Sequence, residues 1–181
     1  MNPAGLKKIQ ILILDDHDLF REGLARLLEA EPDFSAVQCS TVREALQVVS
    51  KTAIDIVLLD YDLGLQRGSE FLTRARQENF QGRILVVTAG LSDKDAAQLL
   101  RDGVAGIFSK HSSPELLAKC LRQVIQGAPW IDIRYANALA RVPEADPDGR
   151  KPTFTDRERA ILRGVFEGLG EQRDCRSLEC F

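Results

Sequence analysis

The sequence predicts an α/β protein with a parallel sheet, and two observations carry that prediction. Continuous apolar runs that end in a polar residue alternate with segments whose apolar residues recur at helical spacing. This alternation occurs five times within the first two thirds of the 181 residues. It is typical of β/α units, in which each helix follows a buried strand.

Taken in order, the expected strands occupy five short apolar runs: residues 9–14, 34–39, 54–59, 84–87 and 107–109. The first helix is expected to bury an apolar stripe of Leu19, Phe20, Leu24, Leu27 and Leu28, and to end at Glu31 and Pro32. Thr41 and Glu44 have the spacing of a capping box, which starts the second helix. Gly64 and Gly68 interrupt the loop before the third helix.

Caps also mark the later helices. Ser92 is expected to cap the fourth helix, and Ser113 with Pro114 occupies the N-cap and first-turn positions of the fifth. Beyond Gly127 the alternation stops, and we predict a short helical extension over residues 131–139. Residues 141–152 are rich in proline and charge and are predicted to form a linker.

Composition restricts the class of protein. With 44% hydrophobic residues and seven prolines, the chain can bury one full core and a smaller second unit. The net charge of −3 provides no overall basic field for nucleic acid. No apolar run approaches the roughly 18 residues of a membrane span, and the N-terminal residues lead into a strand instead of a signal peptide. We therefore expect a cytoplasmic protein with no membrane contact.

The cysteines support the same compartment. The chain has four of them, none in a CxxC pair: Cys39, Cys120, Cys175 and Cys180. That arrangement argues against a zinc site and a disulfide framework. Cys39 and Cys120 lie in apolar segments, where small core residues are the expected interpretation.

The residues that end the strands share a chemical character. In an open α/β sheet the ligand site lies outside the carboxyl ends of the strands. The residues brought there are Asp15, Asp16, Asp60, Thr88 and Lys110. Three carboxylates in one crevice repel one another unless a cation joins them, and Mg²⁺ prefers such oxygen ligands.

This set of side chains suits phosphoryl transfer. A carboxylate beside Mg²⁺ can attack a phosphoryl group and become an aspartyl phosphate, and Asp60 on the central strand is the expected nucleophile. Thr88 and Lys110 are expected to bind two of the phosphoryl oxygens. Any one strand-end Asp is more often a turn or cap residue, so the prediction depends on the whole combination.

Residues 9–126 resemble a receiver domain in four stretches: ILILDDHD, IVLLDYDLGLQRG, LVVTAG and GIFSKHSSPELL. DDHDLFREGLARLLE and KHSSPELLAKCLRQVIQGAPWI resemble the NarL/FixJ group of two-component response regulators, which join a receiver to a LuxR-type helix-turn-helix. The resemblance implies a flavodoxin-like, doubly wound sheet of five parallel strands in the order 2-1-3-4-5. It also implies a protein that accepts a phosphoryl group without turning over an external substrate.

The resemblance implies site residues and partners as well. Asp60 would be phosphorylated by a sensor histidine kinase, and Mg²⁺ would be bound by Asp16, Asp60, the backbone carbonyl of Asp62 and, through water, Asp15. The resemblance further implies that the surface of the fourth helix, fifth strand and fifth helix faces partners, and a homodimer is also an expectation. Three positions depart from the family pattern: Gly64 replaces a proline, which is expected to loosen its loop, His111 replaces another proline, and Ile107 replaces a switching aromatic residue.

Three other side chains have ordinary structural interpretations. His17 and His111 lack a partner at metal-ligand spacing, so we expect exposed loop histidines. Trp130 is expected to pack the extension against the fifth helix.

The end of the chain resembles only part of a LuxR-type domain. KPTFTDRERAILRGVFEGL resembles its opening helix, with Thr155 and Glu158 as a capping box, but the resemblance stops after Leu169. We predict a receiver over residues 1–128, an extension and linker over 129–152 and an incomplete helix-turn-helix over 153–181, with DNA reading lost. An out-of-frame tail and a natural short end both remain open explanations.

Two other functions compete with the phosphoaccepting one. The chain could be a receiver that binds proteins independently of phosphate, as Ile107 weakly favours. It could also be a phosphatase, because LLDYDLG resembles a DxD nucleophile loop in which Asp62 would be the general acid. That loop does not explain Asp15 and Asp16.

Overall fold

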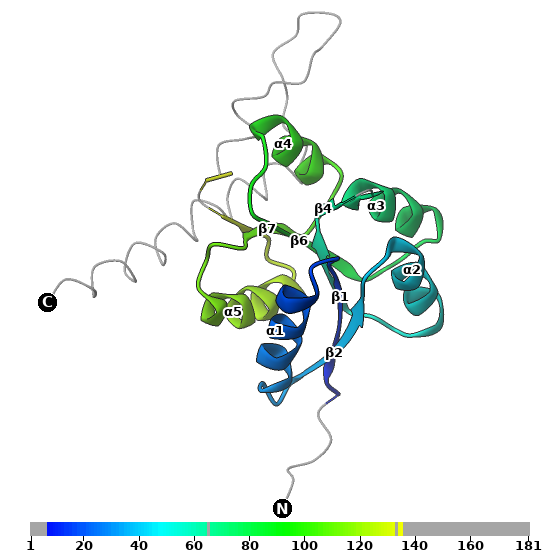
Figure 1. Ribbon diagram of the computed structural model, residues 1–181, viewed down its shortest axis with the longest axis vertical. Helices are drawn as coiled ribbons and strands as arrows, with labels where there is room; N and C mark the ends of the chain where they lie inside the picture. The colour runs from blue at the N-terminus through cyan, green and yellow to red at the C-terminus, as the bar shows by residue number, and fades with distance from the viewer. Residues whose placement is uncertain (1–6, 65, 133, 136–181) are drawn as a thin grey trace, which may run out of the picture.

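The computed structural model describes residues 7–64, 66–132 and 134–135. They contain a parallel sheet of six strands in the order β2-β1-β3-β6-β7-β8 (Figure 1). The first five strands of this order are the predicted ones, in the predicted positions. Their bounds are Ile9–Leu14 (β1), Phe34–Cys39 (β2), Ile56–Asp60 (β3), Arg83–Thr88 (β6) and Gly106–Ser109 (β7).

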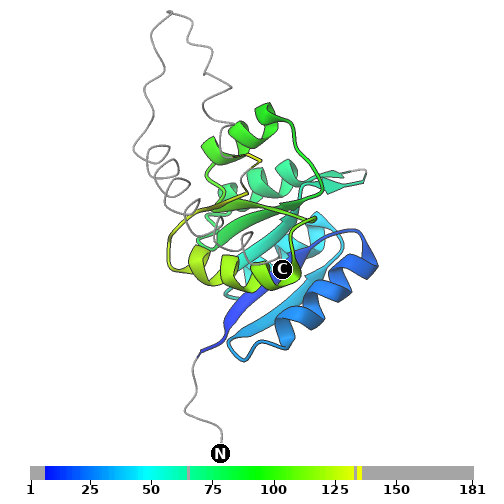
Figure 2. The same cartoon turned by 90° about the vertical axis from the view of Figure 1, so that its left-hand side faces the viewer.

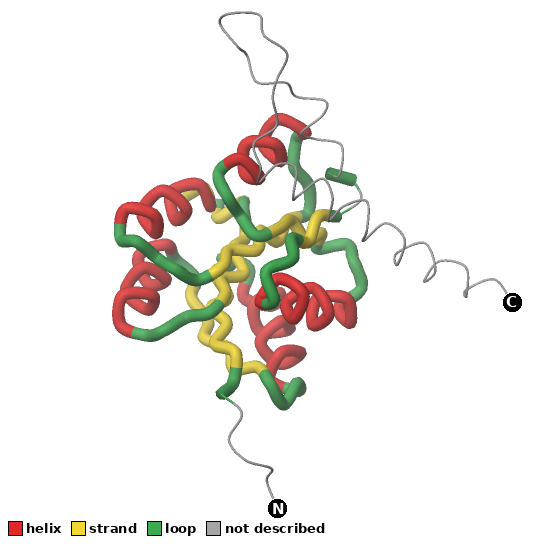
Figure 3. Tube along the Cα trace, turned by 180° about the vertical axis from the view of Figure 1, so that it is seen from behind, coloured by secondary structure: helices red, strands yellow, loops and turns green. Residues whose placement is uncertain are grey.

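Helices cover both faces of the sheet, as Figures 1 and 3 show. One face carries α1 (Asp18–Glu29) and α5 (Pro114–Ile125), and the other carries α2 (Val42–Lys51), α3 (Gly68–Gln77) and α4 (Asp93–Arg101). Successive residues of a strand point to opposite faces. Ile11 and Ile13 therefore pack in the core beneath α1 and α5, whereas Leu12 and Leu14 pack in the other core. Because both faces of the sheet are covered, the central strand β3 is buried along its whole length and is apolar up to Asp60.

Local sequence signals locate the helix starts correctly. Thr41 is the N-cap of α2 and its hydroxyl accepts the Glu44 N–H at 3.2 Å. Ser92 caps α4 by accepting the Asp95 N–H at 3.1 Å. Ser113 is the N-cap of α5, with Pro114 following it, but its side chain makes no capping hydrogen bond.

A sixth strand corrects the five-stranded prediction and the start of the predicted helical extension. Residues Trp130–Ile131 form β8, which pairs parallel with β7. The Trp130 N–H donates to Ala105 O at 3.2 Å, and the Asp132 N–H donates to Ile107 O at 3.0 Å. Without β8, the outer edge of β7 would leave these carbonyls unpaired. Trp130 is buried in the core that contains α5, as expected.

Leu19 is a second correction, because it lies outside the apolar stripe of α1. Its side chain is 87% exposed, whereas Leu28 is fully buried and Phe20, Leu24 and Leu27 pack against the core. Leu19 lies about 100° around the helix from Phe20. It therefore shares the solvent face of α1 with exposed residues such as Glu22.

The loop after β3 contains two short paired strands. β4 (Asp62–Leu63) and β5 (Gln66–Arg67) form a two-stranded antiparallel ribbon that projects from the body of the protein (Figure 2). Gly64 begins its turn with φ +61°. A proline, whose φ is fixed near −65°, cannot adopt this conformation. Gly64 thus has a backbone conformation that the proline of the family pattern could not adopt.

Several predictions fall outside the described residues. They concern the linker over 141–152, the helix-turn-helix fragment over 153–181, and Cys175 and Cys180. Cys39 and Cys120 are buried free thiols, as predicted, and burial raises the pKa of Cys39 to about 11. Across the described part of the chain, no helix has both the length and the apolar character that crossing a membrane requires.

Candidate functional site

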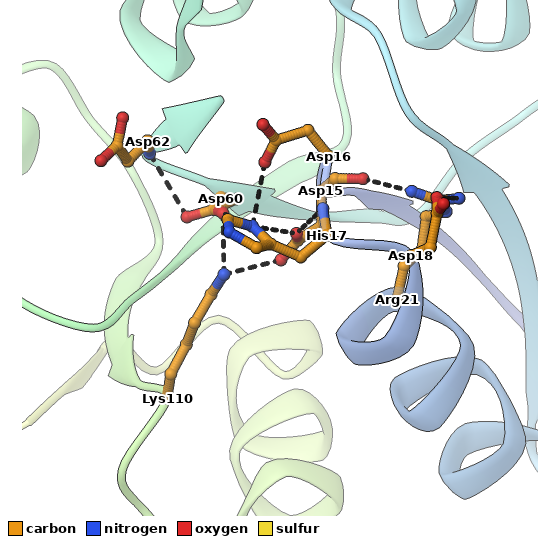
Figure 4. Close-up of polar contacts among 8 residues, drawn as sticks. All are labelled: Asp15, Asp16, His17, Asp18, Arg21, Asp60, Asp62 and Lys110. Carbon is orange, nitrogen blue, oxygen red and sulfur yellow. Dashed lines mark hydrogen bonds and ion pairs between the residues drawn. The ribbon is translucent and has the colours of Figure 1, made fainter. Parts of the chain in front are cut away.

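The strand ends bring the predicted polar side chains to one edge of the sheet. Leu14 pairs with Leu59, so Asp15 and Asp60 follow adjacent strand positions on β1 and β3. Thr88 pairs with Ser109 at the ends of β6 and β7, which places Lys110 one residue further along. Figure 4 shows Lys110 reaching across to both aspartates.

Lys110 joins the two most deeply buried carboxylates. Its Nζ donates to Asp15 Oδ2 at 2.8 Å and to Asp60 Oδ2 at 2.7 Å. The Asp15 and Asp60 side chains are each 3% exposed, and that of Lys110 is 15% exposed. The ammonium group also lies 4.4 Å from the centre of the Phe20 ring, at cation–π distance. This network fixes the orientation of the Asp60 carboxylate.

The electrostatics of the network show an excess of negative charge. Burial raises the pKa of Asp60, and the neighbouring Asp15 carboxylate adds to the rise, while Lys110 opposes it. Partial burial acts to lower the pKa of Lys110, but its hydrogen bonds to Asp15 and Asp60 outweigh that effect and raise this pKa overall. Lys110 therefore stays cationic at neutral pH, and Asp60 remains in a site that would gain from a further positive charge.

Asp16 and His17 complete the acidic edge. Oxygen atoms of Asp15, Asp16 and Asp60 and a ring nitrogen of His17 all lie within 4.8 Å of one another. His17 Nδ1 is 3.0 Å from Asp16 Oδ1 and 3.3 Å from Asp15 Oδ1. His17 is exposed, as predicted, but it does have partners at the site. His17 Nδ1 is also 3.7 Å from Asp60 Oδ2, a contact that sequence spacing could not indicate because Asp60 comes from another strand.

The donor set fits a hard divalent cation. Three carboxylates converge here, and Lys110 forms ion pairs with the two buried ones. Oxygen ligands and uncompensated negative charge are what Mg²⁺ binding requires. A magnesium ion would be held by the Asp15, Asp16 and Asp60 side of the cluster.

Thr88 is placed at the site but its hydroxyl is directed into its own loop. The side chain is buried, accepts the Gly90 N–H at 3.2 Å and lies 3.1 Å from Gly90 O. Ile107, the position of the family's aromatic residue, is fully buried in the core. Binding of a phosphoryl oxygen by Thr88 would therefore require its bonds to Gly90 to be exchanged.

Asp62 contributes its backbone rather than its carboxylate. Its N–H lies 3.3 Å from Asp60 Oδ1, to which it donates. Figure 4 shows the Asp62 carboxylate pointing away from Asp60 and Lys110. The side chain is thus poorly placed for general acid catalysis, which argues against the DxD phosphatase interpretation.

Sequence reasoning missed Arg21, in addition to the contacts of His17. The Arg21 guanidinium donates to the Asp15 carbonyl at 2.7 Å and to Asp18 Oδ1 at 2.5 Å. It links the first turn of α1 to the end of β1 and so holds the acidic segment in place. Asp18 and Arg21 have i, i+3 helical spacing, which was the available signal.

Comparison with known proteins agrees with this geometry. The response regulator receiver domain family matches residues 11–122, which is more than half of the chain. The chain belongs to the response regulator receiver family. The chain aligns over 173 residues with the nitrate/nitrite response regulator protein NarL of Escherichia coli K12, at 29% identity, covering 93% of this chain and 80% of NarL. A nitrate/nitrite response regulator homologue of Haemophilus influenzae is 28% identical over 167 residues, covering 92% of this chain and 79% of the homologue.

Solved structures give the same result. A LuxR-family two-component response regulator from Aurantimonas superposes with a TM-score of 0.68 at 28% identity, covering 75% of this chain and 97% of that one. The receiver of a putative NarL from Mycobacterium tuberculosis gives a TM-score of 0.63 at 27% identity, covering 67% and 99%. The chain thus carries the receiver of a NarL/FixJ-type response regulator, and its relatives are signalling proteins.

Proposed function

We propose that the receiver accepts a phosphoryl group on Asp60 from the phosphohistidine of a sensor histidine kinase. The observation that carries this proposal is the pairing of the buried Asp60 with Lys110 beside two further carboxylates. A buried carboxylate held in one orientation can attack a phosphorus atom in line. The phosphorus–nitrogen bond of the donor breaks as a bond forms to an Asp60 oxygen, and the histidine leaves.

The residues around Asp60 have separate roles in this proposal. A bound Mg²⁺ would neutralise phosphoryl oxygens during transfer, held by Asp16, Asp60, the Asp62 carbonyl and, through water, Asp15. Lys110, which stays cationic, supplies a counter-charge at the same site. The Thr88 hydroxyl is the second group that would bind a phosphoryl oxygen.

The wider role follows from the same proposal. We infer a cytoplasmic phosphoprotein that relays a signal and turns over no external substrate, with residues 1–128 as the receiver. Homodimerisation and DNA contact are properties to be tested on the intact chain.

The test is intact-mass analysis after incubation with Mg²⁺ and acetyl phosphate. The wild-type chain should gain one phosphoryl group, and Asp60→Asn should gain none because the nucleophilic oxygen is lost. Asp102→Asn is the matched control, since Asp102 pairs with Arg76 at the end of α4 and has no role at the acidic cluster. An adduct that survives in Asp60→Asn would refute the assignment. No adduct in the wild type would favour a phosphate-independent binding module.

A further inference from the structure

The residues after β8 contact the loop that follows Thr88. The Leu91 N–H, three residues beyond Thr88, donates to the Tyr135 hydroxyl at 3.0 Å. Tyr135 is 4% exposed, and its ring packs in the same core cluster as Leu91 and Ile107. The hydroxyl therefore reaches a backbone group of the β6–α4 loop from a firmly packed ring.

The same segment contacts the loop that carries Lys110. Arg134 donates to the hydroxyl of Ser109, the residue before Lys110. Ser112 donates to the Asp132 carboxylate at 3.3 Å. Asp132, Arg134 and Tyr135 thus contact the two loops that contribute phosphoryl-binding groups.

In the loop arrangement held by Tyr135, the Thr88 hydroxyl is bonded to its own loop. The Thr88 hydroxyl exchanges hydrogen bonds with Gly90, one residue before Leu91. A hydroxyl has one hydrogen to donate, so a Thr88 hydroxyl that donates to a phosphoryl oxygen must give up its bond to Gly90 O. Movement of the loop that accompanies this exchange would compete with the bond from Leu91 to Tyr135, because Gly90 and Leu91 are adjacent.

We propose that Tyr135 is a positioning residue for the phosphoryl switch. Its hydroxyl holds the β6–α4 loop in the arrangement where Thr88 bonds to Gly90, and phosphorylation of Asp60 releases this hydrogen bond. The phosphorylation state is thereby transmitted to residues 132–135, from which the rest of the chain continues. The proposal rests on the phosphoacceptor role of Asp60.

Tyr135→Phe in the full chain tests the proposal, because it removes the hydroxyl and keeps the ring. Beryllofluoride with Mg²⁺ serves as the phosphoryl mimic, and amide hydrogen exchange at Leu91 is followed by NMR. In the wild type, Leu91 should be protected without the mimic and lose protection when it is saturating. In Tyr135→Phe, Leu91 should be unprotected in both states. The half-saturating beryllofluoride concentration should fall about two- to tenfold, the range expected for one hydrogen bond.

Thr41→Ala is the matched control. It also removes one hydrogen bond between a side-chain hydroxyl and a backbone N–H, but at the start of α2. That position follows β2, which is the outer strand on the other side of the sheet from β8. Its beryllofluoride affinity should equal that of the wild type. Trp130 is the chain's only tryptophan and is buried, so its unchanged emission in each ligand-free variant verifies that the fold is intact.

The outcomes distinguish the proposed role of Tyr135 from the proposed role of Asp60 as phosphoacceptor. Wild-type affinity and a protected Leu91 in Tyr135→Phe would overturn the role of Tyr135 and leave the role of Asp60 standing. A wild-type chain that fails to bind beryllofluoride, or binds it equally after Asp60→Asn, would overturn both.

Discussion

At the scale of single residues, the site depends on one lysine that pairs with two buried carboxylates. Transfer of a carboxylate from water to a protein interior is costly unless a counter-charge and hydrogen bonds replace the lost hydration. Lys110 supplies both to Asp15 and Asp60, at 2.8 and 2.7 Å. Asp16 receives no such bond from Lys110 and is about one third exposed, so it is the carboxylate most available to a cation from solvent.

Gly64 is the second residue on which the site depends. We expect Gly64→Ala to destabilise the protein by about 1–2 kcal/mol, because an L side chain is strained at positive φ. A Cβ there would also lie 2.9 Å from Asp16 Oδ2, so the carboxylate would have to move. Mg²⁺ affinity, measured by calorimetric titration, should therefore fall.

Gly90→Ala is the control for this prediction. A Cβ at Gly90 would meet nothing within 4 Å, and its backbone is not in the positive-φ region. The free energy of unfolding and the Mg²⁺ affinity should remain close to wild type. Equal effects of the two substitutions would show that Gly64 has no special role.

At the scale of secondary-structure elements, the N-cap residues differ in how much they stabilise the helices that they begin. Thr41 and Ser113 are both N-caps in extended conformation, yet only Thr41 accepts a hydrogen bond from the helix it begins. A cap residue stabilises a helix chiefly by satisfying one of its free N–H groups. The same sequence signal therefore has different energetic value at the two positions.

The two caps provide a paired prediction. Thr41→Ala should lower the free energy of unfolding by about 1 kcal/mol, because the Glu44 N–H loses its side-chain partner. Ser113→Ala should cost at most a few tenths of that amount, since no such bond exists there. Urea denaturation of the two variants compares them directly, and an equal loss at both sites would contradict the explanation.

At the scale of the whole molecule, an ion-pair network ties α5 to the connection between α1 and β2. Arg122 donates to Asp33 Oδ1 at 2.8 Å, to Asp33 Oδ2 at 2.9 Å and to Glu31 Oε2 at 2.7 Å. Its guanidinium also lies 5.0 Å from the centre of the Phe34 ring. These contacts join segments about 90 residues apart, and so they form only in the folded state.

This network predicts a pH dependence of stability. The hydrogen bond from Arg122 lowers the pKa of Asp33 below its ordinary value of 3.8. The contribution of the Arg122–Asp33 pair to the free energy of unfolding should be fully present well above pH 3.8. It should be lost as the pH falls through the lower pKa that Asp33 has in the folded state. Asp33→Asn should cost about 0.5–1 kcal/mol at neutral pH, a value that allows for solvent screening of this partly exposed pair.

Denaturation curves of wild type and Asp33→Asn between neutral pH and pH 2 measure this difference. The two free energies of unfolding should converge at the acidic end. Glu22→Gln is the control, because the Glu22–Arg26 pair is exposed and its atoms are 3.7 Å apart. A cost for Asp33→Asn that does not change with pH would exclude the ion pair as its source.

The sequence by itself determined the order of the β/α units, the helix caps at Thr41 and Ser92, and the polar residues that end the strands. These features follow from periods of two to four residues, within which neighbours constrain one another directly. The close meeting of Asp15, Asp60 and Lys110 could also be predicted, because parallel strands share one carboxyl edge.

Only the tertiary structure decided which side chains touch across that edge and beyond it. The contacts of His17 with Asp60, the bond from Leu91 to Tyr135, the solvent exposure of Leu19 and the addition of β8 to the sheet all depend on packing between distant segments. Leu91 and Tyr135 are 44 residues apart in the chain. No local pattern records such a contact, because its free energy comes from burial and hydrogen bonding that exist only once the sheet and helices have assembled.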